Sequence, residues 1–151
     1  MSHARRLGSA LVALVIPVNG CGGDRPALAV DMSAERRPGI VELDGRPAQV
    51  DVPDTAAAGA LVRVRVVTYG GGCMRPGGTD ARVDGRVAEV RPYDSVRTRV
   101  VAPEACPAVL AYYPHEATVR FAAPGPATVR VYGRADPGGA ERVIERTLTV
   151  R

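Results

Sequence analysis

The sequence predicts an all-β domain, an antiparallel β-sandwich of about eight short strands. From Ile40 onward, apolar and polar residues alternate with a period of two, which is typical of strands with one buried face. Asp-Gly pairs and Gly/Pro-rich segments separate these stretches and predict tight reversals of the chain. No stretch after Ile40 shows a convincing helical stripe of apolar residues. A chain of 151 residues, 46% of them hydrophobic, fits one such domain.

The first segment of the chain has the layout of an export signal. Residues 1–6 carry two arginines and no acid, and residues 7–18 form an uncharged, mostly apolar run. A run of this length matches the core of a signal peptide and is well short of the roughly 20 residues that span a bilayer. We therefore expect residues 1–20 to be absent from the folded domain.

The run ends in Val-Asn-Gly-Cys at residues 18–21, which resembles the lipobox of bacterial lipoproteins. Asn19 departs from the small residue usual at its position. The resemblance implies that Cys21 receives a diacylglyceryl group and becomes the first mature residue. The mature protein would then be exported and anchored in the cell envelope, at the outer membrane if the host has one. The alternative is an ordinary secretory signal that leaves Cys21 as a plain thiol.

The chain has three cysteines, and an odd number in an exported protein leaves one unpaired. If lipid occupies Cys21, an even pair remains. We therefore predict an intrachain disulfide between Cys73 and Cys106, as expected outside a reducing cytosol.

Residues 21–39 mix glycine, proline and charge and are interpreted as a tether, so the folded domain is expected over residues 40–151. In chain order, the expected inward rows are Ala48/Val50/Val52, Val62/Val64/Val66, Val96/Val100, Ala117/Val119/Phe121, Ala127/Val129/Val131 and Ile144/Leu148/Val150. Asp44-Gly45 and Asp84-Gly85 predict two-residue hairpin turns.

This segmentation, and the closing GPATVRVYG strand at residues 125–133, resemble bacterial immunoglobulin-like domains over roughly residues 40–151. The core tryptophan of true immunoglobulin domains is missing, since the chain contains none. The resemblance implies a sandwich architecture, and a fold of this kind carries no function by itself.

Charge and composition exclude several classes of function. The net charge is +4, and falls to +2 once Arg5 and Arg6 are removed with the signal, which argues against nucleic acid as a partner. After residue 20 the chain has one histidine, His115, so a metal site or a histidine-based catalytic relay is not expected. We expect a monomeric, non-enzymatic protein with no cofactor.

Two segments are the candidate binding loops. Residues 70–80 combine glycines with Arg75, and residues 103–116 contain Tyr112, Tyr113 and His115. The alternative is structural: a disulfide-pinned loop, with the tyrosines closing one end of the sandwich. The resulting hypothesis is a lipid-anchored module with a binding or structural role, whose partner is an envelope protein or glycan. The alternative hypothesis is a secreted ligand-binding or inhibitor domain that uses these two loops.

Overall fold

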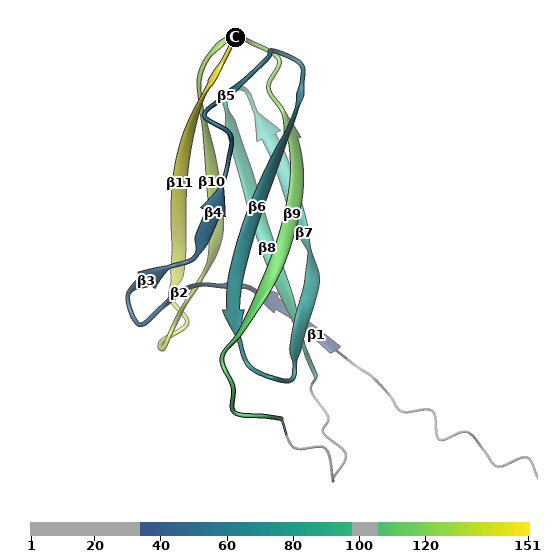
Figure 1. The fold of residues 1–151 in the computed structure, drawn as a ribbon, viewed down its shortest axis with the longest axis vertical. Coiled ribbons are helices and arrows are strands. Elements are labelled where there is room, and N and C mark those ends of the chain that lie inside the picture. The colour runs from purple at the N-terminus through teal and green to yellow at the C-terminus, as the bar shows by residue number, and fades with distance from the viewer. Residues whose placement is uncertain (1–33, 98–105) are drawn as a thin grey trace, which may run out of the picture. The chain divides into compact units, whose positions relative to one another are not determined.

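The computed structural model describes residues 34–97 and 106–151, which form eleven β-strands and, within these ranges, no helix (Figure 1). The strands are β1 (Ala34–Pro38), β2 (Ile40–Leu43), β3 (Arg46–Pro47), β4 (Gln49–Asp51), β5 (Thr55–Ala56), β6 (Leu61–Gly70), β7 (Met74–Asp84), β8 (Val87–Arg97), β9 (Ala111–Arg120), β10 (Gly125–Asp136) and β11 (Glu141–Val150).

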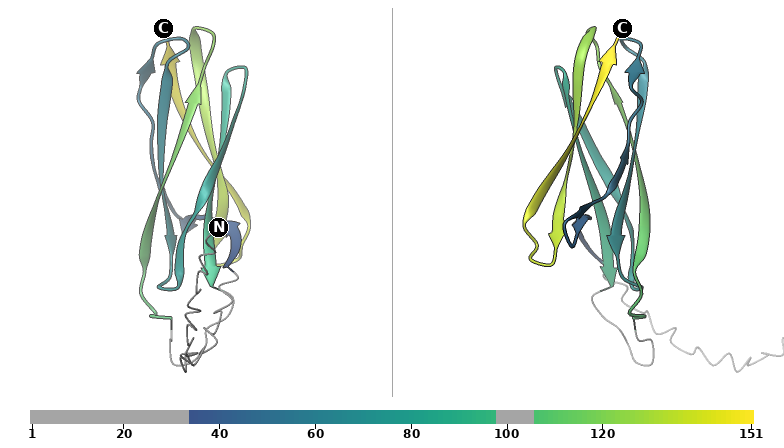
Figure 2. Two further views of the ribbon diagram at one scale, coloured as in Figure 1. Left: turned by 90° about the vertical axis from the view of Figure 1, so that its right-hand side faces the viewer. Right: turned by 60° about the vertical axis from the view of Figure 1, so that its left-hand side comes forward.

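The strands belong to one continuous sheet that curls strongly into a half-barrel (Figure 2). On one flank, β8 pairs with β7 and β10 pairs with β11. On the other flank, β6 pairs with β9 and with β4. Strand β2 connects the flanks, because it pairs with β10 on one side and with β6 on the other. The inward side chains of both flanks therefore share one core.

The all-β prediction is confirmed, whereas a purely antiparallel arrangement is not what the structure has. Three pairs are parallel: β8 with β10, β2 with β10, and β5 with β11. The reason is that alternation along a strand determines which face is buried, but leaves the direction of the neighbouring strand open.

The sheet also begins earlier than the expected boundary at Ile40, within the segment 21–39 interpreted as a tether. Residues Ala34–Pro38 form β1, which pairs antiparallel with the end of β8. All five residues of β1 are exposed, so this strand has no buried alternating face that the sequence could reveal.

The core consists mainly of valine and alanine from both flanks, with Phe121 as its largest side chain. Val62, Val64 and Val66 of β6 are buried as predicted, and so are the predicted rows of β9 and β10. Val52 and Ile144 are partly buried against the core, and Val100 lies outside the described residues.

The two Asp-Gly pairs behave differently. Asp44 and Gly45 have φ values of 49° and 74°, as a hairpin turn with two left-handed residues requires. The second turn is shifted by one residue, because Asp84 is still part of β7 and the loop is Gly85-Arg86. Gly85 takes the left-handed position there, with a φ of 56°.

The predicted disulfide is present. Cys73 and Cys106 are bonded, with their Cα atoms 5.2 Å apart, and the bond ties the β6–β7 loop to the segment before β9. We call this end of the sheet, formed by residues 70–74 and 106–112, the disulfide end. The bond is consistent with an extracytoplasmic domain. Cys21 and the predicted signal at residues 1–20 lie outside the described residues.

Within the described ranges, no helix has the length and apolar character needed to cross a bilayer.

Candidate functional site

The two predicted binding loops are largely strands. Residues 74–80 belong to β7, and residues 111–116 belong to β9. The glycines and proline of the first segment are accommodated by a shift in register between Pro76 and Thr79, where β7 bulges against β8. The turn-forming composition is therefore the signature of an irregular strand, and the connecting loop is limited to residues 71–73.

The predicted binding residues are only partly available at the surface of the disulfide end. Arg75 is exposed on β7, and Tyr112 is 60% exposed, with its ring centroid 5.8 Å from that of Tyr69. The Tyr113 hydroxyl donates a hydrogen bond to the carbonyl of Gly71. Burial, and in second place the negative charge of Asp94, raise the pKa of Tyr113 above that of an exposed tyrosine. Tyr113 therefore supports the loop.

His115 is predicted to lie in a binding loop, but it lies in β9 and is only 3% exposed. The alternation of β9 places its side chain on the same inward face as Ala117 and Val119, and Pro114 on the outward face. A ligand at the surface cannot reach it without opening the sheet.

A buried polar cluster surrounds His115 and joins the two flanks. The Thr68 hydroxyl donates to the Asp94 carboxylate at 3.0 Å, and His115 Nε2 lies 3.1 Å from both Thr68 Oγ1 and Asp94 Oδ1. In a catalytic triad, the carboxylate and the hydroxyl contact opposite ring nitrogens. Here both contact Nε2, and Thr68 and Asp94 are fully buried. The geometry favours a structural role for this cluster.

A second arrangement, on the outer face of the sheet, has the character of a ligand site. Strands β8 and β10 pair in parallel from Val87/Thr128 to Val90/Val131 and then separate, and we call the gap between the separated strands the fork. Gly39, the junction between β1 and β2, lies in this gap. Its amide donates to the Pro92 carbonyl and its carbonyl accepts from the Arg134 amide, both at 2.9 Å.

Glycine is required on both sides of this junction. A Cβ added to Gly39 would lie 2.6 Å from Thr68 Cγ2, and one added to Gly133 would lie 2.6 Å from the Gly39 carbonyl oxygen and 2.5 Å from Val41. The lack of side chains therefore lets the junction pass between β8 and β10.

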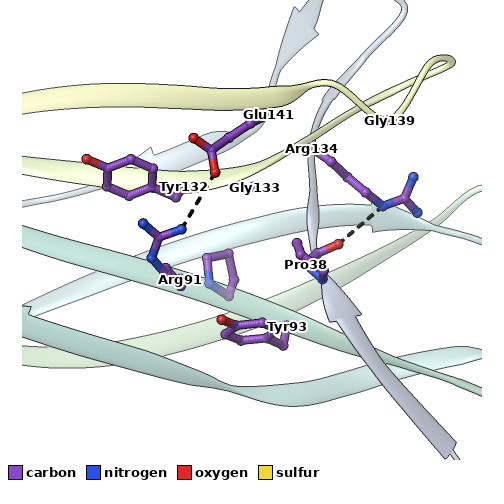
Figure 3. A pocket seen from close by; sticks show the side chains of 9 residues that line it. Pro38, Arg91, Tyr93, Tyr132, Gly133, Arg134, Gly139 and Glu141 are labelled. Carbon is purple, nitrogen blue, oxygen red and sulfur yellow. Dashed lines mark hydrogen bonds and ion pairs between the residues drawn. The ribbon is translucent and has the colours of Figure 1, made fainter.

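Above the junction is a pocket of about 260 Å³, which we call the fork pocket (Figure 3). Outward residues of β8 and β10 face each other across it, and Glu141 of β11 stands at its side. Its lining is Pro38, Arg91, Pro92, Tyr93, Tyr132, Gly133, Arg134, Gly139 and Glu141.

The charged groups of the fork pocket are held by specific contacts. The Arg91 guanidinium carbon lies 4.1 Å from the Tyr132 ring centroid, and Arg91 Nη1 lies 3.8 Å from Glu141 Oε2. Arg134 Nε donates to the Pro38 carbonyl at 3.2 Å. The 3.8 Å separation is too long for a direct hydrogen bond, so both the Arg91 donors and the Glu141 acceptor can engage a polar ligand.

This combination of groups suits a small ligand that has both apolar and polar surfaces. The rings of Tyr93 and Tyr132 and the exposed Pro38 provide apolar surface, while two guanidinium groups donate and one carboxylate accepts hydrogen bonds. The volume is near the lower limit of small-molecule sites. Among the described residues, no group of three or more His, Cys, Asp and Glu side chains has the arrangement of a metal site.

Comparison of the chain with protein-family models, with curated proteins and with solved structures yields no match in any of the three. One sequence signal could have pointed to the fork pocket: Tyr93 and Tyr132 occupy outward positions of alternating strands, in a chain with few aromatic residues.

Proposed function

We propose that this protein is a lipid-anchored, extracytoplasmic, non-enzymatic binding module that holds a saccharide of the cell envelope in the fork pocket. The facing flanks of the sheet, with one core between them, also support a relationship to immunoglobulin-like sandwiches. The observation that carries the localisation is the cysteine pairing: Cys73 and Cys106 are bonded to each other, so Cys21 at the end of the apolar run is the one left for lipid.

The anchor is tested by metabolic labelling with palmitate in a bacterial host. We expect the wild-type protein to be labelled, Cys21→Ser to be unlabelled, and globomycin to cause accumulation of the uncleaved precursor. Acyl chains contribute about 0.8 kcal/mol per buried methylene, so the labelled protein should remain with the membrane fraction after a high-salt wash. An unlabelled wild-type protein would contradict the anchor.

The case for a saccharide rests on the mixed character of the fork pocket. Sugar rings present apolar C–H faces that pack on aromatic rings, and their hydroxyl groups both donate and accept hydrogen bonds. Tyr93 and Tyr132 offer aromatic rings for the first property, each with one face covered by a guanidinium group, that of Arg36 at 3.7 Å and that of Arg91 at 4.1 Å. The Arg91–Glu141 pair matches the second property. Arg91 is also near Glu89, at 3.8 Å, so its charge is partly balanced and the pocket does not require an anionic ligand.

Binding is tested with a panel of bacterial envelope saccharides, by glycan array and then by calorimetry on the best ligand. Removing one tyrosine ring, in Tyr93→Ala or Tyr132→Ala, is expected to weaken binding about tenfold, since an aromatic contact contributes up to about 1.5 kcal/mol. Tyr112→Ala is the matched control, because Tyr112 is exposed at the disulfide end, away from the pocket lining. Equal losses in all three variants, or no binding by the wild type, would contradict the proposal.

A further inference from the structure

The disulfide end carries a concentrated apolar surface. Among the described residues, six large apolar side chains are exposed, and three of them are Val109 (55%), Leu110 (51%) and Tyr112 (60%), within four consecutive positions. We call these three residues, with the neighbouring Tyr69, the apolar tip. Several exposed apolar side chains close together are typical of contact sites, whereas single exposed apolar residues are ordinary.

The apolar tip is held in place by the surrounding structure. The Cys73–Cys106 bond fixes the chain just before Val109, and Tyr113 is bonded to the Gly71 carbonyl. Tyr69 and Tyr112 are directly opposite each other in the β6–β9 ladder. A hollow of about 300 Å³ adjoins this surface, lined by Leu110, Tyr69 and Met74 on one part and by Arg134 and Asp136 on another. The chain that carries these side chains is therefore tied to the β6–β7 loop on both sides of Val109 and Leu110.

The chain enters the described domain at this same end. Ala34, the first residue of β1, pairs with Arg97 at the end of β8, and the adjacent Val96 pairs with both Glu35 and Met74 (Figure 1). Thirteen peptide steps separate Cys21 from Ala34, so their distance is at most about 45 Å. The opposite end of the domain lies further from Ala34 by about the length of β6, which has ten residues and spans about 33 Å.

We infer that the apolar tip docks on the surface of the lipid bilayer, an inference that rests on the proposed anchor at Cys21. The tethered end of the domain is the one that can meet the membrane most readily, and it is the end that exposes Val109 and Leu110. Aliphatic side chains gain free energy by entering the acyl boundary, and tyrosines favour the headgroup region. The exposed Arg75, next to Met74 on β7, would add attraction to anionic headgroups.

The absence of tryptophan from the chain makes a direct test possible. Leu110→Trp and Leu61→Trp each place one indole on the domain, the first in the apolar tip and the second at the opposite end of β6, where Leu61 is 66% exposed. Each lipidated, full-length variant is reconstituted into vesicles of dioleoylphosphatidylcholine, and into an equal mixture with dioleoylphosphatidylglycerol. Part of the lipid carries brominated acyl chains that quench nearby indoles.

We expect Leu110→Trp to show emission shifted to shorter wavelength and strong quenching by brominated lipid, and Leu61→Trp to show neither. Equal, water-like emission from both variants would overturn the inference. An emission shift of Leu110→Trp that depends on protein concentration, with no quenching by brominated lipid, would also overturn the inference, since a second copy of the protein would then cover the tip. Failure of the anchor can be distinguished from failure of the docking, because a protein without lipid on Cys21 would not float with the vesicles.

Discussion

Asp94→Ala is expected to lower the free energy of unfolding by about 2–5 kcal/mol, because it leaves two buried polar groups without a partner and each costs about 1–3 kcal/mol. The Asp94 carboxylate is fully buried, accepts a hydrogen bond from Thr68, and lies 3.1 Å from His115 Nε2. Its removal leaves a hydroxyl and an imidazole inside the core without their shared acceptor. Urea unfolding of the oxidised protein measures the change.

Asp80→Ala is the matched control, because Asp80 likewise makes a side-chain contact, to Arg36 at 2.8 Å, but its side chain is 59% exposed. Exposed pairs contribute up to about 1 kcal/mol, so a small change is expected. Equal decreases in the free energy of unfolding of the two variants would contradict a stabilising role of the buried cluster. A third variant, in which Thr68, Asp94 and His115 are all replaced by apolar residues of similar volume, should recover much of the loss, since no polar group then remains unpaired.

The cluster shows how far alternation alone can be taken. The row Val62, Val64, Val66 was predicted from the sequence, and Thr68 is simply the next inward position of β6. In the same way, His115 continues the inward row of Ala117 and Val119. Proximity in sequence does not place His115 beside the exposed Tyr112, because successive residues of a strand point to opposite faces.

The fork pocket could not be predicted in this way. Tyr93 and Tyr132 line the same pocket only because β8 and β10 run parallel and then diverge, and the sequence pattern contains no information on that pairing. Gly39 and Gly133 create the room for the β1–β2 junction, yet nothing in the sequence distinguishes them from glycines in turns. Both features depend on contacts between residues far apart in the chain.

The disulfide was predictable for a different reason. The number of cysteines and the resemblance of residues 18–21 to a lipobox are enough to predict it, wherever Cys73 and Cys106 lie in the fold. The surroundings of the bond are different, because the strands β7 and β9 that flank it contain the glycines and prolines typical of loops.

Removal of this disulfide in Cys73→Ala/Cys106→Ala is expected to lower the free energy of unfolding by about 4 kcal/mol. The bond closes a loop with a sequence separation of 33 residues, and the chain-entropy estimate for such a loop is of this size. Urea unfolding of the double variant, compared with the wild-type protein in the presence and absence of reductant, measures the effect. Reduced wild-type protein should match the double variant.

Cys21→Ser is the control for the loss of a thiol, and its free energy of unfolding should equal that of the wild type, because residue 21 precedes the described sheet. The double variant also separates two functions of the disulfide. If the bond acts only on the unfolded chain, saccharide binding at the fork pocket should be unchanged under conditions where the protein remains folded, since neither cysteine is one of its lining residues. If the bond also holds the apolar tip, quenching of Leu110→Trp by brominated lipid should decrease in the same background.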